Sequence, residues 1–220
     1  GAPMELVWAD GVQGILLMYL GGEACGGACA DLLLGVVNPG GKLAETWPFT
    51  AADASSHVYF PGYPLTVEYR EGLFVGYRYY DTAQKAVRYP FGYGLAYTRF
   101  EYSNLRLSAD QIKDSDTLTV SCTVTNVGSR AGSEAVQLYV SRKGSVIIRA
   151  EQELKGFEKI HLKAGESQEV RFALTGRDFA YYNTELGGWT VESGDSEVRI
   201  GASSRDMLLT GRGWACLFVP

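Results

Sequence analysis

Apolar and polar residues alternate along the second half of this chain, and this alternation limits the possible fold more than any other feature. Every second residue is apolar in Thr117–Thr125, and Ala135–Val140 repeats the pattern. A period of two is typical of a β-strand with one buried face. Turn-forming residues at 126–128 and 164–166 separate the runs. The further strands that we predict are Phe100–Leu107, Glu153–His161, Gln168–Leu174, Gly188–Glu192, Glu197–Gly201 and Met207–Thr210.

About seven or eight short strands within residues 98–220 fit an antiparallel β-sandwich of the immunoglobulin type. Cys122 and Cys216 lie in this part, but no Cys…Trp…Cys spacing indicates an antibody-like disulfide. The aromatic residues here are scattered, so we expect them in the core rather than in a row that binds polysaccharide. They are Tyr139, Phe157, Phe172, Phe179, Tyr181, Tyr182, Trp189 and Trp214.

The start of the chain has a different pattern. Ile15–Leu20 is a short apolar run, typical of a buried parallel strand, and the glycines at 21–22 form a tight turn. Glu23–Leu34 is predicted to be a helix that ends at Gly35. Strand, turn and helix make one unit of an α/β sandwich, and we interpret residues 1–58 as the end of such a domain. The apolar stripe of the predicted helix is Ala24, Ala28 and Leu32.

A glycine turn between a strand and a helix also occurs in phosphate-binding loops. The glycines at 21–22 lack the spacing of either nucleotide fingerprint, and Glu23 at the helix start would repel an anion. We therefore predict no nucleotide and no other cofactor.

Residues 59–97 are dense in aromatic side chains, because 13 of the 27 aromatic residues lie between Tyr59 and Phe100. They belong to a longer connection, residues 38–97, and a loop of about 60 residues with little regular structure is unusual unless it wraps another surface. Such glycine-spaced aromatic stretches stack on sugars in some proteins and more often pack one domain on another. We interpret residues 59–97 as an interdomain strap, with sugar binding as the alternative.

Charge and residue content argue against several classes of function. The net charge of −5 argues against a nucleic-acid partner, and no apolar run approaches the ~18 residues of a membrane span. Cys25 and Cys29 lie four residues apart without a nearby histidine, which makes a poor zinc site. We expect reduced, packed thiols, a cytoplasmic setting and no metal site. His57 and His161 are expected at the surface.

Several segments carry motifs that occur together in one known family. They are GGEACGGACADLLLGVVNPGGKLAETWP at 21–48, YREGLFVGYRYYD at 69–81, YPFGYGL at 89–95, TVTNVGSRAGSEAVQLYV at 123–140 and LKGFEK at 154–159. The first three resemble the late part of the α/β sandwich domain of glycoside hydrolase family 3 and the segments after it. The last two are similar to the fibronectin type III-like domain at the C-terminal end of that family. The resemblance runs nearly from end to end and departs from the family at Cys25 and Cys29, where small or polar residues are usual.

The resemblance implies the C-terminal portion of an exo-acting, retaining β-glycosidase, with β-glucosidase as the first choice. Retaining hydrolysis needs a carboxylate nucleophile and a carboxylic acid about 5–5.5 Å apart. In the family these lie on an N-terminal (β/α)8 barrel and on an earlier loop of the sandwich domain, and neither motif matches a position here. We therefore expect no catalytic residue and no hydrolysis by this chain alone.

The same resemblance implies the partners. They are the barrel and the first part of the sandwich domain, in the same or a separate chain, and a β-linked oligosaccharide or glucoside bound by the complete enzyme. Residues 1–58 would complete the sandwich domain, 59–97 would be the strap and 98–220 the fibronectin type III-like domain. The alternative function is a carbohydrate-binding or spacer β-sandwich module.

Single carboxylates within or beside these motifs have simpler roles than catalysis. For Glu23, Glu45, Glu68 and Glu71 we expect helix capping or salt bridges. Glu71, together with the arginines at 70 and 78, is predicted to brace the strap against the barrel. We also predict self-association into a homo-oligomer, because a strand at Leu16–Leu20 without neighbours would leave an unpaired edge and apolar surface.

Overall fold

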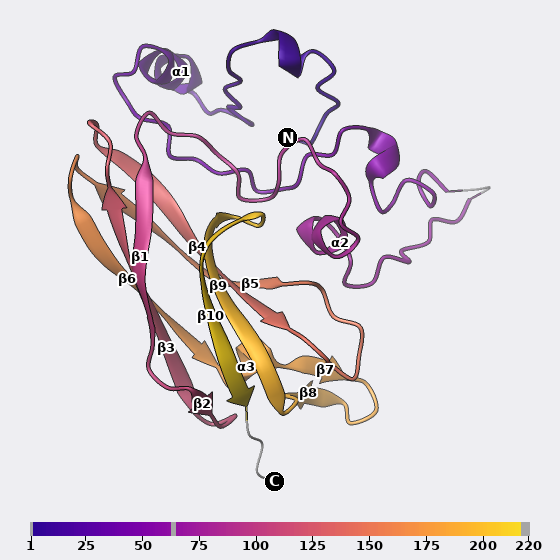
Figure 1. The fold of residues 1–220 in the computed structure, drawn as a ribbon. Helices are drawn as coiled ribbons and strands as arrows, with labels where there is room; N and C mark the ends of the chain where they lie inside the picture. Colours follow the sequence, from indigo (N-terminus) through magenta and orange to yellow (C-terminus); the bar gives the residue numbers. More distant parts are fainter. Residues whose placement is uncertain (1, 63–64, 217–220) are drawn as a thin grey trace.

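The structure is a computed structural model that describes residues 2–62 and 65–216, the last five of these by their backbone only. Figure 1 shows a β-sandwich formed by the second half of the chain, with residues 2–97 lying along one of its ends. The last described strand, β10 (Asp206–Cys216), ends at the opposite end of the sandwich (Figure 1). No helix of the described residues has the length and apolar character to cross a membrane.

The sandwich consists of two sheets and confirms the predicted fold class. One sheet has the order β1-β3-β6 and the other the order β2-β10-β9-β4-β5. All neighbours pair antiparallel except β10 and β2, which are parallel. The strands are β1 (Phe100–Leu107), β2 (Gln111–Ile112), β3 (Thr117–Asn126), β4 (Gly132–Arg142), β5 (Glu153–Leu162), β6 (Ser167–Thr175), β9 (Gly194–Ser203) and β10 (Asp206–Cys216).

The core lies between the two sheets and contains the alternating apolar residues that the sequence predicted to face inward. Val120 and Val124 of β3 and Val136 of β4 are completely buried. Cys122 lies among them as a free thiol. Burial raises the pKa of this thiol to about 11, which leaves it protonated and unreactive at neutral pH.

Strand β4 departs from simple alternation because both of its faces are covered. Its outward residues Gln137 and Tyr139 are as inaccessible as the core residues beside them. Residues 77–92 pack over this outer face, as the contacts of Gln137 and Tyr139 with Gly92 and Tyr77 show. Strand β4 of the sandwich (residues 98–216, the second unit) therefore also packs against residues 77–92 of the preceding part (residues 2–62 and 65–97, the first unit).

Three aromatic residues that we expected in the core are exposed, so that prediction was wrong for them. Phe157 is 66% exposed on β5, because it pairs with Gln137 on the face of the sheet away from the core. Tyr182 and Trp189 are 50% and 54% exposed. They lie on β7 (Tyr181–Asn183) and β8 (Gly188–Thr190), which form a separate two-stranded sheet after α3 (Gly176–Phe179). The side chain of Trp214 lies outside the described residues.

The predicted helix near the start of the chain is present as α1 (Cys25–Leu33) and ends as expected at Gly35. Gly35 has a φ of +70°, and the bonds Gly35 N–H to Leu32 O and Val36 N–H to Asp31 O form a Schellman cap. The predicted stripe was partly wrong, because Ala24 and Ala28 are exposed. The half-buried face of the helix consists of Cys25, Cys29 and Leu32.

The predicted strand at Ile15–Leu20 is absent, which is the main error in the predicted elements. The segment forms no ladder with another part of the described chain, and Tyr19 has a φ of +47° that no strand accommodates. A strand needs a neighbouring strand that forms hydrogen bonds with its backbone groups. Among the described residues, no strand pairs with this segment. The remaining elements of this part are short: η1 (Ala9–Gly11), η2 (Ala51–Asp53) and α2 (Tyr77–Thr82).

Candidate functional site

The four glutamates that the sequence singled out do not form a common site. Glu23 is exposed before α1, Glu45 is half-buried, and Glu68 makes an exposed ion pair with Arg70 at 2.5 Å. Within residues 2–62 and 65–216, Glu71 has no ion pair, so the arginines at 70 and 78 do not brace it. A brace between Glu71 and a separate barrel stays a prediction.

The side chains with metal-ligand chemistry are also dispersed. Cys25 and Cys29 are half-buried free thiols, and His57 and His161 are exposed as predicted. The Nδ1 atom of His161 lies 3.1 Å from the hydroxyl of Ser133, at the strand edge. In the part of the chain that the structure describes, no three His, Cys, Asp or Glu side chains gather in a way that could hold a metal ion.

One polar contact between residues 2–97 and the sandwich is an ion pair that the sequence did not predict. Asp81 at the end of α2 accepts from Arg205 Nε at 2.7 Å, and Arg205 also donates to the backbone carbonyls of Tyr80 and Lys85. The side chain of Asp81 is only 7% exposed. Burial raises the pKa of the Asp81 carboxyl, and Arg205 offsets only part of that rise. Asp81 ends the quoted 69–81 motif, but nothing in the spacing indicates a partner 124 residues away.

Helix α2 is fixed to the sandwich by two more hydrogen bonds, both to the segment around the start of β5. The Tyr77 hydroxyl accepts from Leu154 N–H at 2.8 Å, and the Thr82 hydroxyl accepts from Glu151 N–H at 2.9 Å. The Tyr77 ring also packs edge-on against Tyr139. One short helix of the aromatic strap is thus tied to β4, β5 and the β9–β10 turn.

The glycine-rich motif at 89–95 places backbone directly against β4. Gln137 Nε2 donates to Gly92 O at 3.2 Å and to Ala202 O at 2.8 Å, and Gln137 Oε1 accepts from the Tyr139 hydroxyl at 2.6 Å. Gly92 has a φ of +78°, and a Cβ there would lie 2.2 Å from Gln137 Oε1. The motif therefore needs glycine at this position for both its backbone angle and its close approach to the sandwich.

A second junction lies near β1 and centres on a buried ion pair. Lys42 Nζ lies 3.1 Å from Glu134 Oε1, and the side chains are 13% and 5% exposed. Tyr102 donates to the same carboxylate at 3.0 Å. Burial, with the Glu134 charge beside it, raises the pKa of Tyr102 far above its ordinary value, so the phenol stays a neutral donor. Removing one partner of such a buried pair typically costs about 3–5 kcal/mol.

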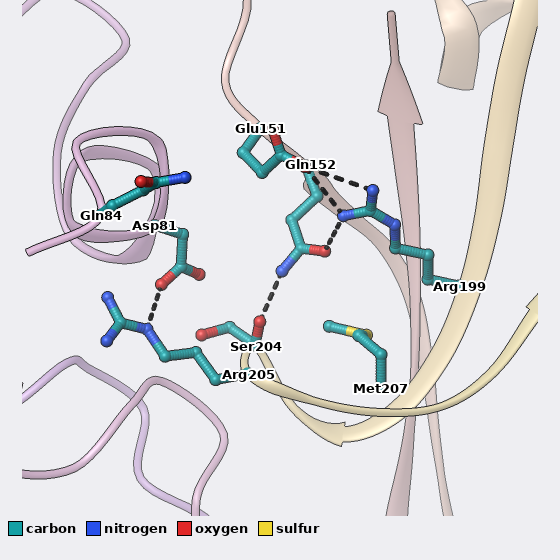
Figure 2. Close-up of a pocket in the computed structure, with 8 residues that line it drawn as sticks. All are labelled: Asp81, Gln84, Glu151, Gln152, Arg199, Ser204, Arg205 and Met207. Atoms are coloured by element: carbon teal, nitrogen blue, oxygen red, sulfur yellow. Dashed lines mark hydrogen bonds and ion pairs between the residues drawn. The ribbon is translucent and has the colours of Figure 1, made fainter.

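A polar pocket of about 370 Å³ opens where α2 meets the sandwich (Figure 2). Asp81 and Arg205 form one side, and Arg199 holds Glu151 and Gln152 on the other, with Gln152 Nε2 donating to Ser204 O at 2.6 Å. Asp81 Oδ2 and Ser204 Oγ are both shielded from solvent and lie beside each other (Figure 2). The Ser204 and Gln152 side chains, like Arg205, favour the ionised form of Asp81 and offset part of the rise in its pKa that burial causes. The lining residues are Asp81, Gln84, Glu151, Gln152, Arg199, Ser204, Arg205 and Met207.

The first unit exposes large apolar side chains to an extent unusual for a folded surface. Its own small core contains only Leu6, Ala9 and Trp47. Large apolar side chains exposed in this number are typical of a part of a protein that another part covers. The residues of this unit with 70% or more exposure are Val7, Leu20, Leu34, Val36, Val58, Phe60, Leu65, Tyr69 and Leu95.

Comparison with known families gives two matches, one in each part of the chain. Residues 1–97 match the glycosyl hydrolase family 3 C-terminal domain, and residues 134–204 match a fibronectin type III-like domain. The junctions described above join these two regions.

Comparison with individual proteins gives consistent results. The chain is 52% identical over 209 residues to thermostable β-glucosidase B of Acetivibrio thermocellus, covering 95% of this chain and 28% of that enzyme. It is 44% identical over 203 residues to an exo-α-(1→6)-L-arabinopyranosidase of Bifidobacterium breve, covering 92% of this chain and 26% of the relative. The solved structure of β-glucosidase 3B from Thermotoga neapolitana superimposes with a TM-score of 0.88 at 46% identity, over 96% of this chain and 30% of that one. The chain thus spans between a quarter and a third of the length of these relatives.

Proposed function

Because this chain belongs to glycosyl hydrolase family 3, as the C-terminal part of its β-glucosidase-like enzymes, we propose that it completes and stabilises the domain that closes over a catalytic site carried elsewhere. The exposed apolar side chains of residues 2–97 carry this proposal. Apolar surface is unfavourable in contact with water. Its burial against another domain would stabilise the assembled protein by about 25 cal/mol for each Å² of apolar surface covered. The complete enzyme would be an exo-acting, retaining β-glycosidase that acts on β-glucosides.

The chain itself has no catalytic role in this proposal. Retaining hydrolysis requires two carboxyl groups about 5–5.5 Å apart that face one sugar. The buried carboxylates Asp81 and Glu134 are each engaged by a cation from the other unit. These two ion pairs support a structural role for Asp81 and Glu134. They would hold residues 2–97 in the conformation that the catalytic domain contacts.

A hydrolysis assay tests the non-catalytic role. The purified chain is incubated with aryl β-glucoside, β-xyloside and β-N-acetylglucosaminide, and we expect no turnover of any of them. Turnover that survives further purification would overturn the proposal, and Glu23, Glu45, Glu68 and Glu71 would be the first residues to substitute.

A chimera tests the stabilising role. The matching segment of the Acetivibrio thermocellus relative is deleted, and this chain is fused in its place. We expect the truncated relative to be inactive and the chimera to hydrolyse aryl β-glucosides. A control chimera carries Lys42→Met, which leaves Glu134 buried without its cation, and we expect a lower melting temperature. A chimera that folds but does not act on any glycoside would contradict the proposal.

A second candidate is the carbohydrate-binding module, and one observation favours it. Tyr182 and Trp189 face each other across the β7–β8 hairpin with ring centroids 5.4 Å apart, and each is about half exposed. The hairpin lies away from residues 2–97 (Figure 1). Sedimentation with insoluble β-glucan tests this candidate, with Trp189→Ala as the variant and Phe157→Ala, another exposed aromatic, as the control. Equal retention of all three proteins would reject it.

A further inference from the structure

Residues 65–70 of the aromatic strap have an extended backbone but belong to no sheet. None of the six lies in a helix or a strand, and none has a positive φ. The Glu68 and Arg70 side chains form an ion pair. Residues two apart lie on the same face of a strand but do not face each other on a helix, so this ion pair indicates an extended segment. In Figure 1 the segment lies at the periphery of the first unit, before α2.

The side chains of this segment alternate in polarity. Leu65, Val67 and Tyr69 form an apolar face and are 97%, 42% and 90% exposed. Polar residues at positions 66, 68 and 70 form the opposite face. A period of two that includes valine, threonine and tyrosine is typical of a strand with one buried face. Here the face that a strand would bury is exposed to water.

The backbone of the segment has one open edge. Among residues 2–62 and 65–216, no backbone group of residues 65–70 forms a hydrogen bond with another backbone group. The Thr66 carbonyl lies against Gly62, where a Cβ would be 2.5 Å from Thr66 O. In an extended strand the N–H and C=O of one residue point to the same edge, and those of the next residue point to the opposite edge. The backbone groups of Val67 and Tyr69 therefore point away from Gly62 and are free to pair with another strand.

We propose that residues 65–70 are an edge strand that is added to a β-sheet in the part of the complete enzyme outside this chain, through the backbone groups of Val67 and Tyr69. The inference rests on the proposed function and names the contact by which the first unit joins the catalytic part. The chain covers only 28% of the Acetivibrio thermocellus relative, so most of such an enzyme could supply the sheet. Strand addition would pair the open backbone edge and bury the apolar face in one step.

A second copy of this chain is a poorer partner for the segment. Two copies paired through residues 65–70 would form an isolated two-stranded ribbon, which is only marginally stable in water. A sheet that already has several strands offers both a formed edge and an apolar layer against which the exposed leucine and tyrosine can pack. The observations therefore favour a sheet of the same enzyme.

Hydrogen exchange resolved at single amides tests the inference. The experiment compares the isolated chain, at a concentration where it is monomeric, with the chimera in which this chain replaces the matching segment of the Acetivibrio thermocellus relative. In the isolated chain we expect the amides of residues 65–70 to exchange as fast as those of an unstructured peptide. In the chimera the amides of Val67 and Tyr69 should exchange about 100-fold more slowly, because they donate to the new neighbour. The amides of Glu68 and Arg70 should remain fast.

A pair of double variants tests the apolar face. Leu65→Thr with Tyr69→Thr removes two apolar side chains but keeps residues that favour strands. We expect it to lower the melting temperature of the chimera and to leave that of the isolated chain unchanged. Thr66→Ser with Glu68→Thr changes the opposite face and is the matched control, which should leave both melting temperatures unchanged. Equal effects of the two double variants on the chimera would contradict burial of the apolar face.

The outcomes separate this inference from the proposed function. Fast exchange of all six amides in a chimera that hydrolyses aryl β-glucosides would overturn the added strand and leave the proposed function standing. Equal slowing at Glu68 and Arg70 would indicate coverage without pairing along one edge and would also overturn it. A folded but inactive chimera would contradict the proposed function, while its exchange pattern still tests the strand.

Backbone chemical shifts of the ¹³C,¹⁵N-labelled isolated chain provide a measurement that does not need the chimera. Shifts typical of extended backbone at residues 65–70, together with fast exchange, would support a preformed strand without a partner. Random-coil shifts throughout the segment would overturn the inference.

Discussion

Arginine side chains fix much of this molecule by donating to backbone carbonyls as well as to carboxylates. Arg205 reaches Asp81 and two carbonyl groups of the strap, and Arg149 donates to Phe179 O and to Glu153. The planar guanidinium can serve several acceptors at once, which a lysine ammonium does with less directional precision. The loss of one such arginine side chain therefore removes several contacts at once.

Substitution of Arg205 by alanine should lower the free energy of unfolding by about 2–4 kcal/mol, because it leaves the buried Asp81 without its cation. Urea denaturation measures the change. Arg171→Ala is the matched control, since its ion pair with Glu169 is exposed, and it should change stability far less than Arg205→Ala. Equal effects of the two substitutions would contradict the importance of the Arg205 junction.

Glu153 should make stability depend on acid pH. Burial alone would raise its pKa, but Lys155 and Arg149 beside it lower the pKa below the ordinary value of 4.5. A carboxyl group with a lowered folded-state pKa contributes stability above its unfolded pKa and loses it as the pH falls through the folded value. The parent chain should therefore exceed Glu153→Gln in free energy of unfolding by about 1–2 kcal/mol at neutral pH. This difference should shrink below pH 4.5, and a difference that is constant down to about pH 3 would contradict the assignment.

Helix α1 shows at the scale of an element how local sequence determines a boundary. Its end depends on the left-handed Gly35, and Arg130 donates to the carbonyl of the same residue from the sandwich. The Tyr97 hydroxyl donates to Leu32 O in the last turn. The helix end is thus fixed both by its own cap and by the second unit.

Gly35→Ala should destabilise the chain by about 1–2 kcal/mol, because alanine is strained at this φ and its Cβ would lie 2.9 Å from Arg130 Nη1. Gly27→Ala lies within the same helix, in open space, and should instead raise stability by about 0.5–1 kcal/mol. Thermal unfolding followed by circular dichroism compares the two. The same sign for both substitutions would contradict the capping role of Gly35.

Elements with a strong local signal could be predicted from the sequence, and those that depend on distant partners could not. The alternation in β3 and β4 and the glycine end of α1 are encoded within about ten residues. The apolar run at Ile15–Leu20 has the composition of a strand, but a strand forms only where a neighbour supplies hydrogen bonds. The two-residue β2 and three-residue β7 are too short for a periodic signal. The pocket residues come from three segments, within 81–84, 151–152 and 199–207, that are far apart in the sequence and that no spacing rule connects.

At the scale of the whole molecule, the two units differ in how well they bury their own apolar residues. The sandwich has a continuous core from both sheets, whereas residues 2–97 bury only a small cluster and expose many large apolar side chains. The first unit keeps its shape largely through polar contacts with the second. This difference fits a chain in which the sandwich provides most of the folding stability and residues 2–97 provide the surface that contacts another domain.

The isolated chain should self-associate as its concentration rises, because Leu20, Leu65 and Tyr69 are 88%, 97% and 90% exposed. Sedimentation velocity over a range of concentrations measures this. Replacement of all three by serine should restore a monomer, while serine at Val146 and Ile148 on the sandwich should have a smaller effect. A monodisperse parent chain at high concentration would show that these side chains are covered in another way.

The doubly covered strand β4 has a practical consequence for protein engineering. A recombinant fragment that begins at residue 98 would keep every strand of the sandwich but expose the outer face of β4 to water. Gln137 would lose its hydrogen bond to Gly92, and Tyr139 would lose its ring contact with Tyr77. The portable module therefore extends backward to include α2 and the glycine-rich motif at 89–95. Fusion proteins and domain swaps that are cut at residue 98 would separate β4 from the segment that covers its outer face.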